Sequence, residues 1–130
     1  MGEVWRGHHD TTGLPVAAKV VREELARVPE HVATFRNEVR AMARLDHPCI
    51  LTVLDYGEVD RAAAIASQGG MLEGSPYLVM EYAGGGSLKD LKRRLGWADI
   101  RRVLISLLDA LAHAHAADVI HRDLKAGNVL

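Results

Sequence analysis

The alternation of apolar and polar residues predicts a small β-sheet in the first part of the chain. Residues 3–6 alternate and residues 16–21 form an apolar run after a polar turn, a pattern typical of a β-hairpin. Two later apolar segments, residues 52–57 and 75–82, predict a second pair of strands. Residues 60–74 between them are long for a hairpin connection and predict an exposed insertion or a short extra helical turn.

Two further segments have the periodicity of a helix. Within about residues 30–45, Phe35, Val39 and Met42 recur at helical spacing. Residues 98–115 predict a strongly amphipathic helix that serves as scaffolding. Its apolar face consists of Ile100, Val103, Leu104, Leu107, Leu108 and Leu111.

Composition limits the classes of partner. The 130 residues are 48% apolar and have a net charge of −1, which fits one soluble globular domain or part of one and gives no electrostatic indication of nucleic-acid binding. The single cysteine, Cys49, cannot form an internal disulfide. The start of the chain lacks a signal-peptide pattern, and no stretch is long enough to span a membrane. We therefore expect a cytoplasmic protein without a membrane segment or a nucleic-acid partner.

Two charged residues lie in apolar surroundings. Lys19 is inside an apolar run, and Glu38 shares the helical face of Phe35 and Met42. Because an unpaired charge removed from water costs several kcal/mol, these two residues are expected to pair with each other. One alternative is that the aliphatic part of the Lys19 side chain packs while its ammonium group reaches water. The other is that Glu38 lies only at the edge of the apolar face of the helix.

The last ten residues, 121–130, form a polar loop between apolar segments. Asp123 and Asn128 are five residues apart on this loop. Phosphoryl transfer needs a carboxylate beside the attacking hydroxyl and an oxygen ligand for magnesium, and this pair can supply both.

The loop matches the H-R-D-L-x-x-x-N pattern of protein kinases at every specified position. Residues 16–19 resemble the V-A-I-K strand of the same enzymes, and residues 45–50 resemble their L-x-H-P-x-I connection, in which His47 is structural. The chain therefore resembles the eukaryotic-type, serine/threonine-like protein kinase family. The resemblance implies an α+β fold, with residues 1–82 as an antiparallel small lobe with one helix and the start of a hinge, and residues 83–130 as the hinge end, the first large-lobe helices and the catalytic loop.

The resemblance also implies roles for individual residues. Asp123 would orient the acceptor hydroxyl or take its proton, Lys125 would neutralise charge on the phosphoryl group, and Asn128 would bind magnesium through its side-chain oxygen. Lys125 favours a serine or threonine of a protein substrate over tyrosine. The cofactors implied are ATP and Mg²⁺. The residues implied to bind ATP are Gly2, Val4, Ala17, Lys19, Glu38, Met80, Glu81, Ala83 and Leu130.

Two other patterns do not indicate ligand sites. Residues 84–86 are all glycine, but no G-K-[ST] follows, and Ser87 with Asp90 three residues later is a helix-capping pattern. A flexible hinge before a helix is expected there. His113 and His115 are two residues apart on a helix, so they point to different faces and do not form a metal pair.

The resemblance covers nearly the whole chain but only about half of a kinase domain. The glycine-rich loop is represented only by Gly2 to Val4, and no D-F-G follows Asn128. We therefore expect an exposed apolar surface on the helix at 98–115, which favours a partner or self-association, and little or no kinase activity in this chain alone. The alternatives are a non-catalytic module that binds ATP or a partner, an aminoglycoside-type phosphotransferase, and a fragment or incomplete gene model of a longer kinase.

Overall fold

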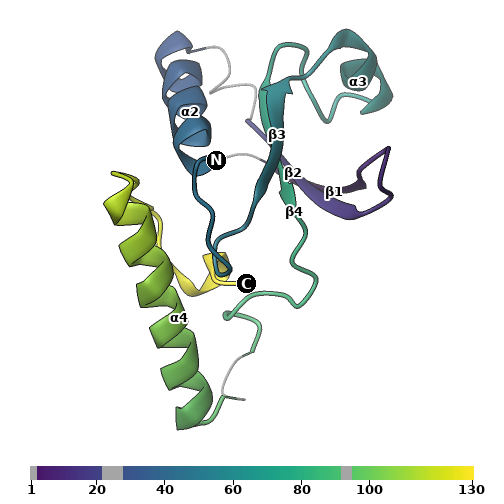
Figure 1. The fold of residues 1–130 in the computed structure, drawn as a ribbon. Coiled ribbons are helices and arrows are strands. Elements are labelled where there is room, and N and C mark those ends of the chain that lie inside the picture. Colours follow the sequence, from purple (N-terminus) through teal and green to yellow (C-terminus); the bar gives the residue numbers. More distant parts are fainter. Residues whose placement is uncertain (1–2, 22–27, 92–94) are drawn as a thin grey trace. The chain divides into compact units, whose positions relative to one another are not determined.

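The computed structural model describes residues 3–21, 28–91 and 95–130 (Figure 1). The chain divides into two compact units. The first, called the sheet unit, contains residues 1–44 and 52–82, and the second, called the helical unit, contains residues 45–51 and 83–130.

The sheet unit is built on an antiparallel sheet of four strands in the order β1-β2-β4-β3. All the strands predicted from the sequence are present, with ends that differ by one or two residues. Together with the helices, the sheet confirms the predicted α+β fold. The strands are β1 (Glu3–His8), β2 (Pro15–Val20), β3 (Val53–Glu58) and β4 (Pro76–Glu81).

Helix α2 (Pro29–Met42) packs against the sheet through Val39, which is 2% exposed. Its proline start is favourable, because the first turn of a helix does not need that N–H group. Glu38 is exposed, so the prediction that it lies on the buried face is wrong. Adjacent residues of a helix are about 100° apart, and with Val39 pointing inward Glu38 turns toward solvent.

The long connection between β3 and β4 contains a short helix, α3 (Arg61–Ala66). Asp60 caps it, because its Oδ1 accepts a hydrogen bond of 2.7 Å from the Ala63 N–H. The loop that follows packs on β1: a Cβ added to Gly70 would lie 2.8 Å from the Trp5 ring. The predicted extra helical turn is therefore present, and the segment after it contacts the sheet.

The main element of the helical unit is α4 (Trp97–Ala116). It ends in a Schellman motif, in which Asp118 has a positive φ of 59° and the N–H groups of Asp118 and Val119 donate to the carbonyls of His115 and Ala114. Only small residues of α4 are buried, whereas Trp97 and Leu108 are 74% and 64% exposed. In the described parts of the chain, no helix is both long enough and apolar enough to cross a membrane.

Residues 45–51 group with the helical unit, although the sequence placed them in the small lobe. The side chain of His47 contacts α4. Its Nε2 lies 3.1 Å from Oδ2 of Asp109 on α4, and its ring stacks at an angle beside His113 with centroids 5.3 Å apart. Its Nδ1 accepts a hydrogen bond of 3.1 Å from the Cys49 N–H, so His47 joins the connection to α4.

Candidate functional site

The polar loop after α4 begins with a tight turn at His121, Arg122 and Asp123. The Asp123 N–H donates a hydrogen bond of 2.7 Å to the carbonyl of His121, and Arg122 has a positive φ of 59°. Such a conformation is costly for a residue with a side chain, and strained residues of this kind cluster at functional sites. The chain then forms the short 3₁₀ helix η1 (Ala126–Asn128). The turn and η1 together set the directions of the side chains between them.

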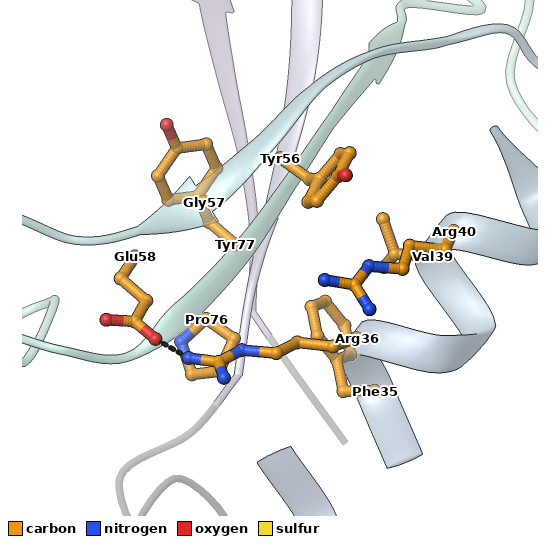
Figure 2. A pocket seen from close by; sticks show the side chains of 9 residues that line it. All are labelled: Phe35, Arg36, Val39, Arg40, Tyr56, Gly57, Glu58, Pro76 and Tyr77. Atoms are coloured by element: carbon orange, nitrogen blue, oxygen red, sulfur yellow. Dashed lines mark hydrogen bonds and ion pairs between the residues drawn. The ribbon is translucent and has the colours of Figure 1, made fainter. Parts of the chain in front are cut away.

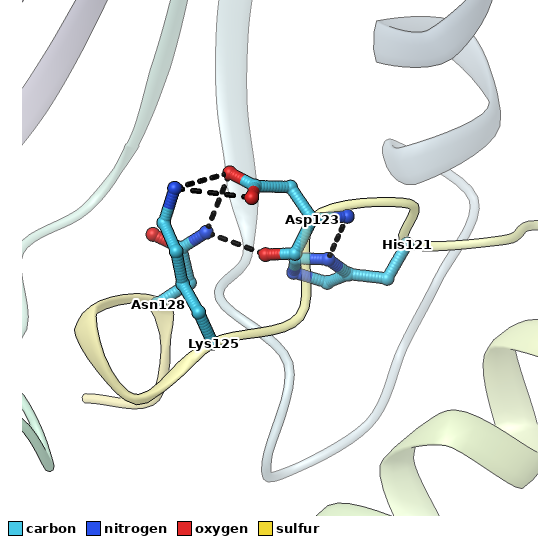
Figure 3. Close-up of polar contacts among 4 residues, drawn as sticks. All are labelled: His121, Asp123, Lys125 and Asn128. Carbon is cyan, nitrogen blue, oxygen red and sulfur yellow. Dashed lines mark hydrogen bonds and ion pairs between the residues drawn. The ribbon is translucent and has the colours of Figure 1, made fainter.

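Asp123, Lys125 and Asn128 form one hydrogen-bonded network (Figure 3). The Lys125 ammonium donates to Oδ1 and Oδ2 of Asp123 at 3.0 and 2.7 Å. Asn128 Nδ2 donates to the Asp123 backbone carbonyl at 2.8 Å and to Oδ2 at 3.1 Å. Both of these bonds use the nitrogen of the Asn128 amide, so its oxygen keeps its lone pairs for another ligand.

The network keeps the Asp123 carboxyl ionised. The hydrogen bond from Lys125, followed by the bond from Asn128, holds the pKa of Asp123 below its usual value. The side chains of Asp123 and Lys125 are 54% and 48% exposed. A substrate can therefore reach a carboxylate that accepts protons, an ammonium group and an amide oxygen at one place.

The oxygen atoms of this loop also fit a magnesium ion in chemical kind, since Mg²⁺ prefers carboxylate and carbonyl oxygens. Asn128 offers its amide oxygen, and the Asp123 carboxylate lies beside it. In the described part of the chain no group of three or more His, Cys, Asp or Glu residues could hold a metal ion. A magnesium ion bound by Asn128 would therefore need further oxygen ligands, such as the phosphates of a nucleotide.

In the sheet unit, the strand register places four of the predicted nucleotide-binding residues on one face of the sheet. Val4 lies opposite Lys19, Ala17 lies opposite Met80, and alternate residues of a strand share a face. Val4 is 66% exposed. We call Val4, Ala17, Lys19 and Met80 the candidate nucleotide face.

Helix α2 covers part of the same side of the sheet. Leu78 is opposite Lys19 on this side, and Tyr56 of β3 is opposite Leu78. Figure 2 shows Tyr56 beside Val39 of α2. Even so, among the residues that the structure describes, no ion pair links Lys19 to Glu38. The exposed position of Glu38 differs from the buried one expected from the sequence, and its pairing with Lys19 stays a prediction.

The remaining predicted residues have different surroundings. Oε1 of Glu81 accepts a hydrogen bond of 2.7 Å from the Thr52 N–H, and the Glu81 N–H donates to the Thr52 carbonyl at 3.1 Å. Ala83 is partly buried and Leu130 is 60% exposed. Gly2 lies outside the described residues.

An open pocket of about 300 Å³ lies between α2 and strands β3 and β4 (Figure 2). Its lining residues are Phe35, Arg36, Val39, Arg40, Tyr56, Gly57, Glu58, Pro76 and Tyr77. None of them belongs to the predicted catalytic or nucleotide-binding sets. An ion pair between the half-exposed side chains of Arg36 and Glu58 borders the pocket. The lining of this pocket therefore does not connect it with the predicted reaction.

Sequence reasoning did not find the contacts that support the polar loop from residues 87–89. The N–H groups of Leu88 and Lys89 donate to the carbonyls of Val129 and Ala126 at 2.7 and 3.1 Å. The only sequence signal was the spacing of Ser87 and Asp90, interpreted as a helix cap. The described residues 87–91 form turns and not a helix.

Comparison with known proteins places these features in context. The family model of the protein kinase domain matches residues 1–130. The probable serine/threonine-protein kinase SCO3848 of Streptomyces coelicolor is 37% identical over 135 residues, which cover the whole of this chain and 18% of that protein. The serine/threonine-protein kinase PknA of Mycobacterium tuberculosis is 40% identical over 133 residues, which cover the whole chain and 29% of PknA.

Among solved structures, the chain is similar to the crystal structure of the Mycobacterium tuberculosis PknI kinase domain. The TM-score is 0.77 at 28% sequence identity, and the match covers 98% of this chain and 48% of the PknI chain. The chain thus spans less than a third of the length of these curated relatives and about half of the solved kinase domain.

Proposed function

Since the chain belongs to the protein kinase family, we propose that it forms part of a serine/threonine kinase that transfers the γ-phosphoryl group of ATP to a protein hydroxyl. The observation that carries this proposal is the network of Asp123, Lys125 and Asn128 on the loop that matches the family's catalytic pattern.

In the proposed reaction, Asp123 orients the acceptor hydroxyl and takes its proton. The hydroxyl oxygen attacks the γ-phosphorus, the bond from that phosphorus to the β,γ-bridging oxygen breaks, and ADP leaves. A depressed pKa keeps the Asp123 carboxylate available as a proton acceptor at neutral pH. The Lys125 ammonium, held beside that carboxylate, stabilises negative charge on the transferred group.

Magnesium, when bound, neutralises charge on the phosphate oxygens. Asn128 would hold the ion through its side-chain oxygen, because its side-chain nitrogen is used to hold Asp123. In the sheet unit, Lys19 would bind nucleotide phosphates, with Val4, Ala17 and Met80 supplying apolar surface on the same face. Gly2, Glu38, Glu81, Ala83 and Leu130 are likewise proposed to contribute to ATP binding, as the resemblance to protein kinases implies.

A protein acceptor is favoured by Lys125, which is typical of serine/threonine kinases, and by the names of the relatives. The exposed apolar residues of α4 are proposed to contact a partner or another part of the kinase. We also propose that the protein acts in the cytoplasm, because a chain with a single cysteine forms no internal disulfide and suits a reducing compartment.

The test uses the gene product that contains residues 1–130 at its full encoded length, with the 130-residue chain alongside. Each is incubated with γ-labelled ATP, with or without Mg²⁺, and with casein or kanamycin as the acceptor. We expect magnesium-dependent label on serine and threonine of casein from the full product, and little or none from the 130-residue chain, which matches only 48% of the PknI chain. Label confined to tyrosine or to kanamycin, or no transfer by the full product, would contradict the proposal.

A further inference from the structure

The helical unit contains a second hydrogen-bonded turn at residues 87–90, called here the Ser87 turn. Oδ2 of Asp90 accepts hydrogen bonds from the Ser87 hydroxyl at 2.6 Å and from the Ser87 N–H at 2.9 Å. The Asp90 N–H in turn donates to the Ser87 carbonyl at 2.8 Å. The carboxylate and the N–H of Asp90 therefore both bind Ser87 and close the turn.

The Ser87 turn is joined to the polar loop by two backbone hydrogen bonds. Leu88 donates to the carbonyl of Val129 at 2.7 Å, and Lys89 donates to the carbonyl of Ala126 at 3.1 Å. These two acceptors lie on either side of Asn128. The Lys89 stem also approaches η1, since its Cδ lies 4.0 Å from the position of a Cβ on Gly127.

The same segment of the polar loop fixes Asn128. The Asn128 N–H donates to the Lys125 carbonyl at 2.8 Å, and its side chain makes the two bonds to Asp123. Asp90 thus holds Ser87, and the two residues after Ser87 bind the carbonyls of Ala126 and Val129, the second of which directly follows Asn128 in the chain. Loosening the first of these bonds gives the η1 segment more freedom.

We propose that Asp90 is a positioning residue for Asn128. Asp90 holds the Ser87 turn in the conformation whose N–H groups bind the η1 segment, and it thereby keeps the Asn128 amide in place against Asp123. The role of this position in catalysis rests on the proposed kinase function. Asp90 itself touches neither the acceptor nor the nucleotide in this scheme.

The charge state of Asp90 suits this task. The bond from the Ser87 hydroxyl, followed by the bond from the Ser87 N–H, holds the pKa of Asp90 below its usual value. The group is therefore a carboxylate at neutral pH, and bonds to an ionised acceptor are stronger than bonds to a neutral one.

The first experiment measures the hydrogen bonds without relying on catalysis. Amide hydrogen exchange is followed by NMR at Leu88, Lys89 and Asn128 in the full gene product and in Asp90→Ala, Asp90→Asn and Asp99→Ala variants. Asp90→Ala is expected to speed exchange at these amides about three- to tenfold, the loss of roughly one net hydrogen bond. Asp90→Asn keeps an acceptor oxygen and is expected to restore most of the protection.

Asp99→Ala is the matched control. Asp99 is another partly exposed carboxylate of the helical unit, and its Oδ1 lies 3.9 Å from the Arg102 guanidinium on the same helix. Its removal should leave exchange at Leu88, Lys89 and Asn128 unchanged. Unchanged exchange at all three amides in Asp90→Ala, or an equal increase in Asp99→Ala, would overturn the proposal.

The second experiment tests the consequence for catalysis. The apparent binding constant for Mg²⁺ is measured from initial rates at saturating ATP, and the thermal unfolding midpoint is measured alongside. Asp90→Ala is expected to weaken apparent magnesium affinity about tenfold, as the loss of a group that orients a metal ligand does, with kcat at saturating Mg²⁺ changed less. Asp90→Asn should be close to the parent protein.

The two experiments separate this proposal from the proposed function. Faster exchange in Asp90→Ala with unchanged magnesium dependence would show that Asp90 stabilises the Ser87 turn. It would nevertheless contradict the proposed role of Asp90 in positioning Asn128 for catalysis. If the parent protein transfers no phosphate, the kinase function fails, and the exchange measurement still decides whether Asp90 holds Asn128.

Discussion

In the helical unit, Lys125 and Asn128 both donate hydrogen bonds to Asp123, whereas in the sheet unit no ion pair joins Lys19 and Glu38, both of them described residues. The first set lies within six consecutive residues, in a segment that one turn and η1 shape. The second pair lies on a strand and a helix, and its distance depends on how α2 packs. The geometry of the polar loop is thus set by short-range contacts, whereas the distance between Lys19 and Glu38 depends on the packing of α2.

The difference suggests that the two regions respond differently to nucleotide. The side chains of the polar loop are held by hydrogen bonds within the loop, so in the proposed reaction we expect them to contribute with little rearrangement. Lys19 and Glu38 can gain their contact only if α2 shifts or Glu38 turns, and a nucleotide that binds Lys19 can supply the differential free energy for such a change. The predictions below test this contrast, from the largest expected effect to the smallest.

Of the variants that compare the two regions, the one that removes Lys125, the cation of the loop, should have the largest effect. Lys125→Ala in the full gene product is expected to lower kcat about 10²–10³-fold, the usual cost of losing one preorganised charge or donor at a transition state. It should also move the acidic limb of the pH–rate profile to higher pH, because Lys125 is the main cause of the low pKa of Asp123. Steady-state kinetics across pH measure both effects.

The sign of the accompanying stability change follows from the same shift. The pKa of Asp123 in the folded protein is below its unfolded value, so its pairing stabilises the fold above the unfolded pKa and is lost as pH falls through the folded pKa. Lys125→Ala should therefore weaken the acid dependence of unfolding. An unchanged acidic limb and an unchanged acid transition would show that Lys125 does not control Asp123.

Removing the ammonium group of Lys19 from the sheet unit should have the next largest effect. Lys19→Met is expected to weaken ATP binding about 10- to 100-fold, since a hydrogen bond to a charged group contributes about 1.5–3 kcal/mol. The free energy of unfolding measured without nucleotide should change much less, because Lys19 is only partly buried. Isothermal titration calorimetry and denaturant unfolding separate the two quantities.

The smallest expected effect is that of a Glu38 substitution on the free energy of unfolding measured without nucleotide. Because its side chain is exposed, Glu38→Gln is expected to change the free energy of unfolding by no more than about 0.5 kcal/mol. A double-mutant cycle with Lys19→Met should give a coupling below about 0.5 kcal/mol in unfolding, and a larger one, about 0.5–3 kcal/mol, in ATP binding. Strong coupling in unfolding would mean that the pair already exists without nucleotide.

Most of the secondary structure could be predicted because it follows hydrophobic periodicity. The alternation around Trp5, the apolar run at β2 and the helical spacing of Val39 and Leu108 each identified the correct element. The loop residues Asp123, Lys125 and Asn128 could be found because a short motif carries both their identity and their spacing.

Other features have no such signal. Helical spacing alone could not tell that Glu38 turns to solvent, because one step around a helix separates a buried position from an exposed one. The bonds from Leu88 to Val129 and from Lys89 to Ala126 join backbone groups, which every residue carries. The left-handed conformation of Arg122 is equally invisible, because the pattern alone suggests no strain there.

The most direct test of the central claim is a single-turnover measurement with the full gene product and its Asp123→Asn variant. Both are mixed with magnesium, limiting ATP and excess protein acceptor, and ATP affinity is measured separately. We predict that phosphoryl transfer falls about 10²–10⁴-fold in the variant while ATP affinity changes less than about threefold, because Asp123 acts on the acceptor hydroxyl. Transfer at the parental rate by Asp123→Asn would show that the loop at 121–130 does not carry the chemistry.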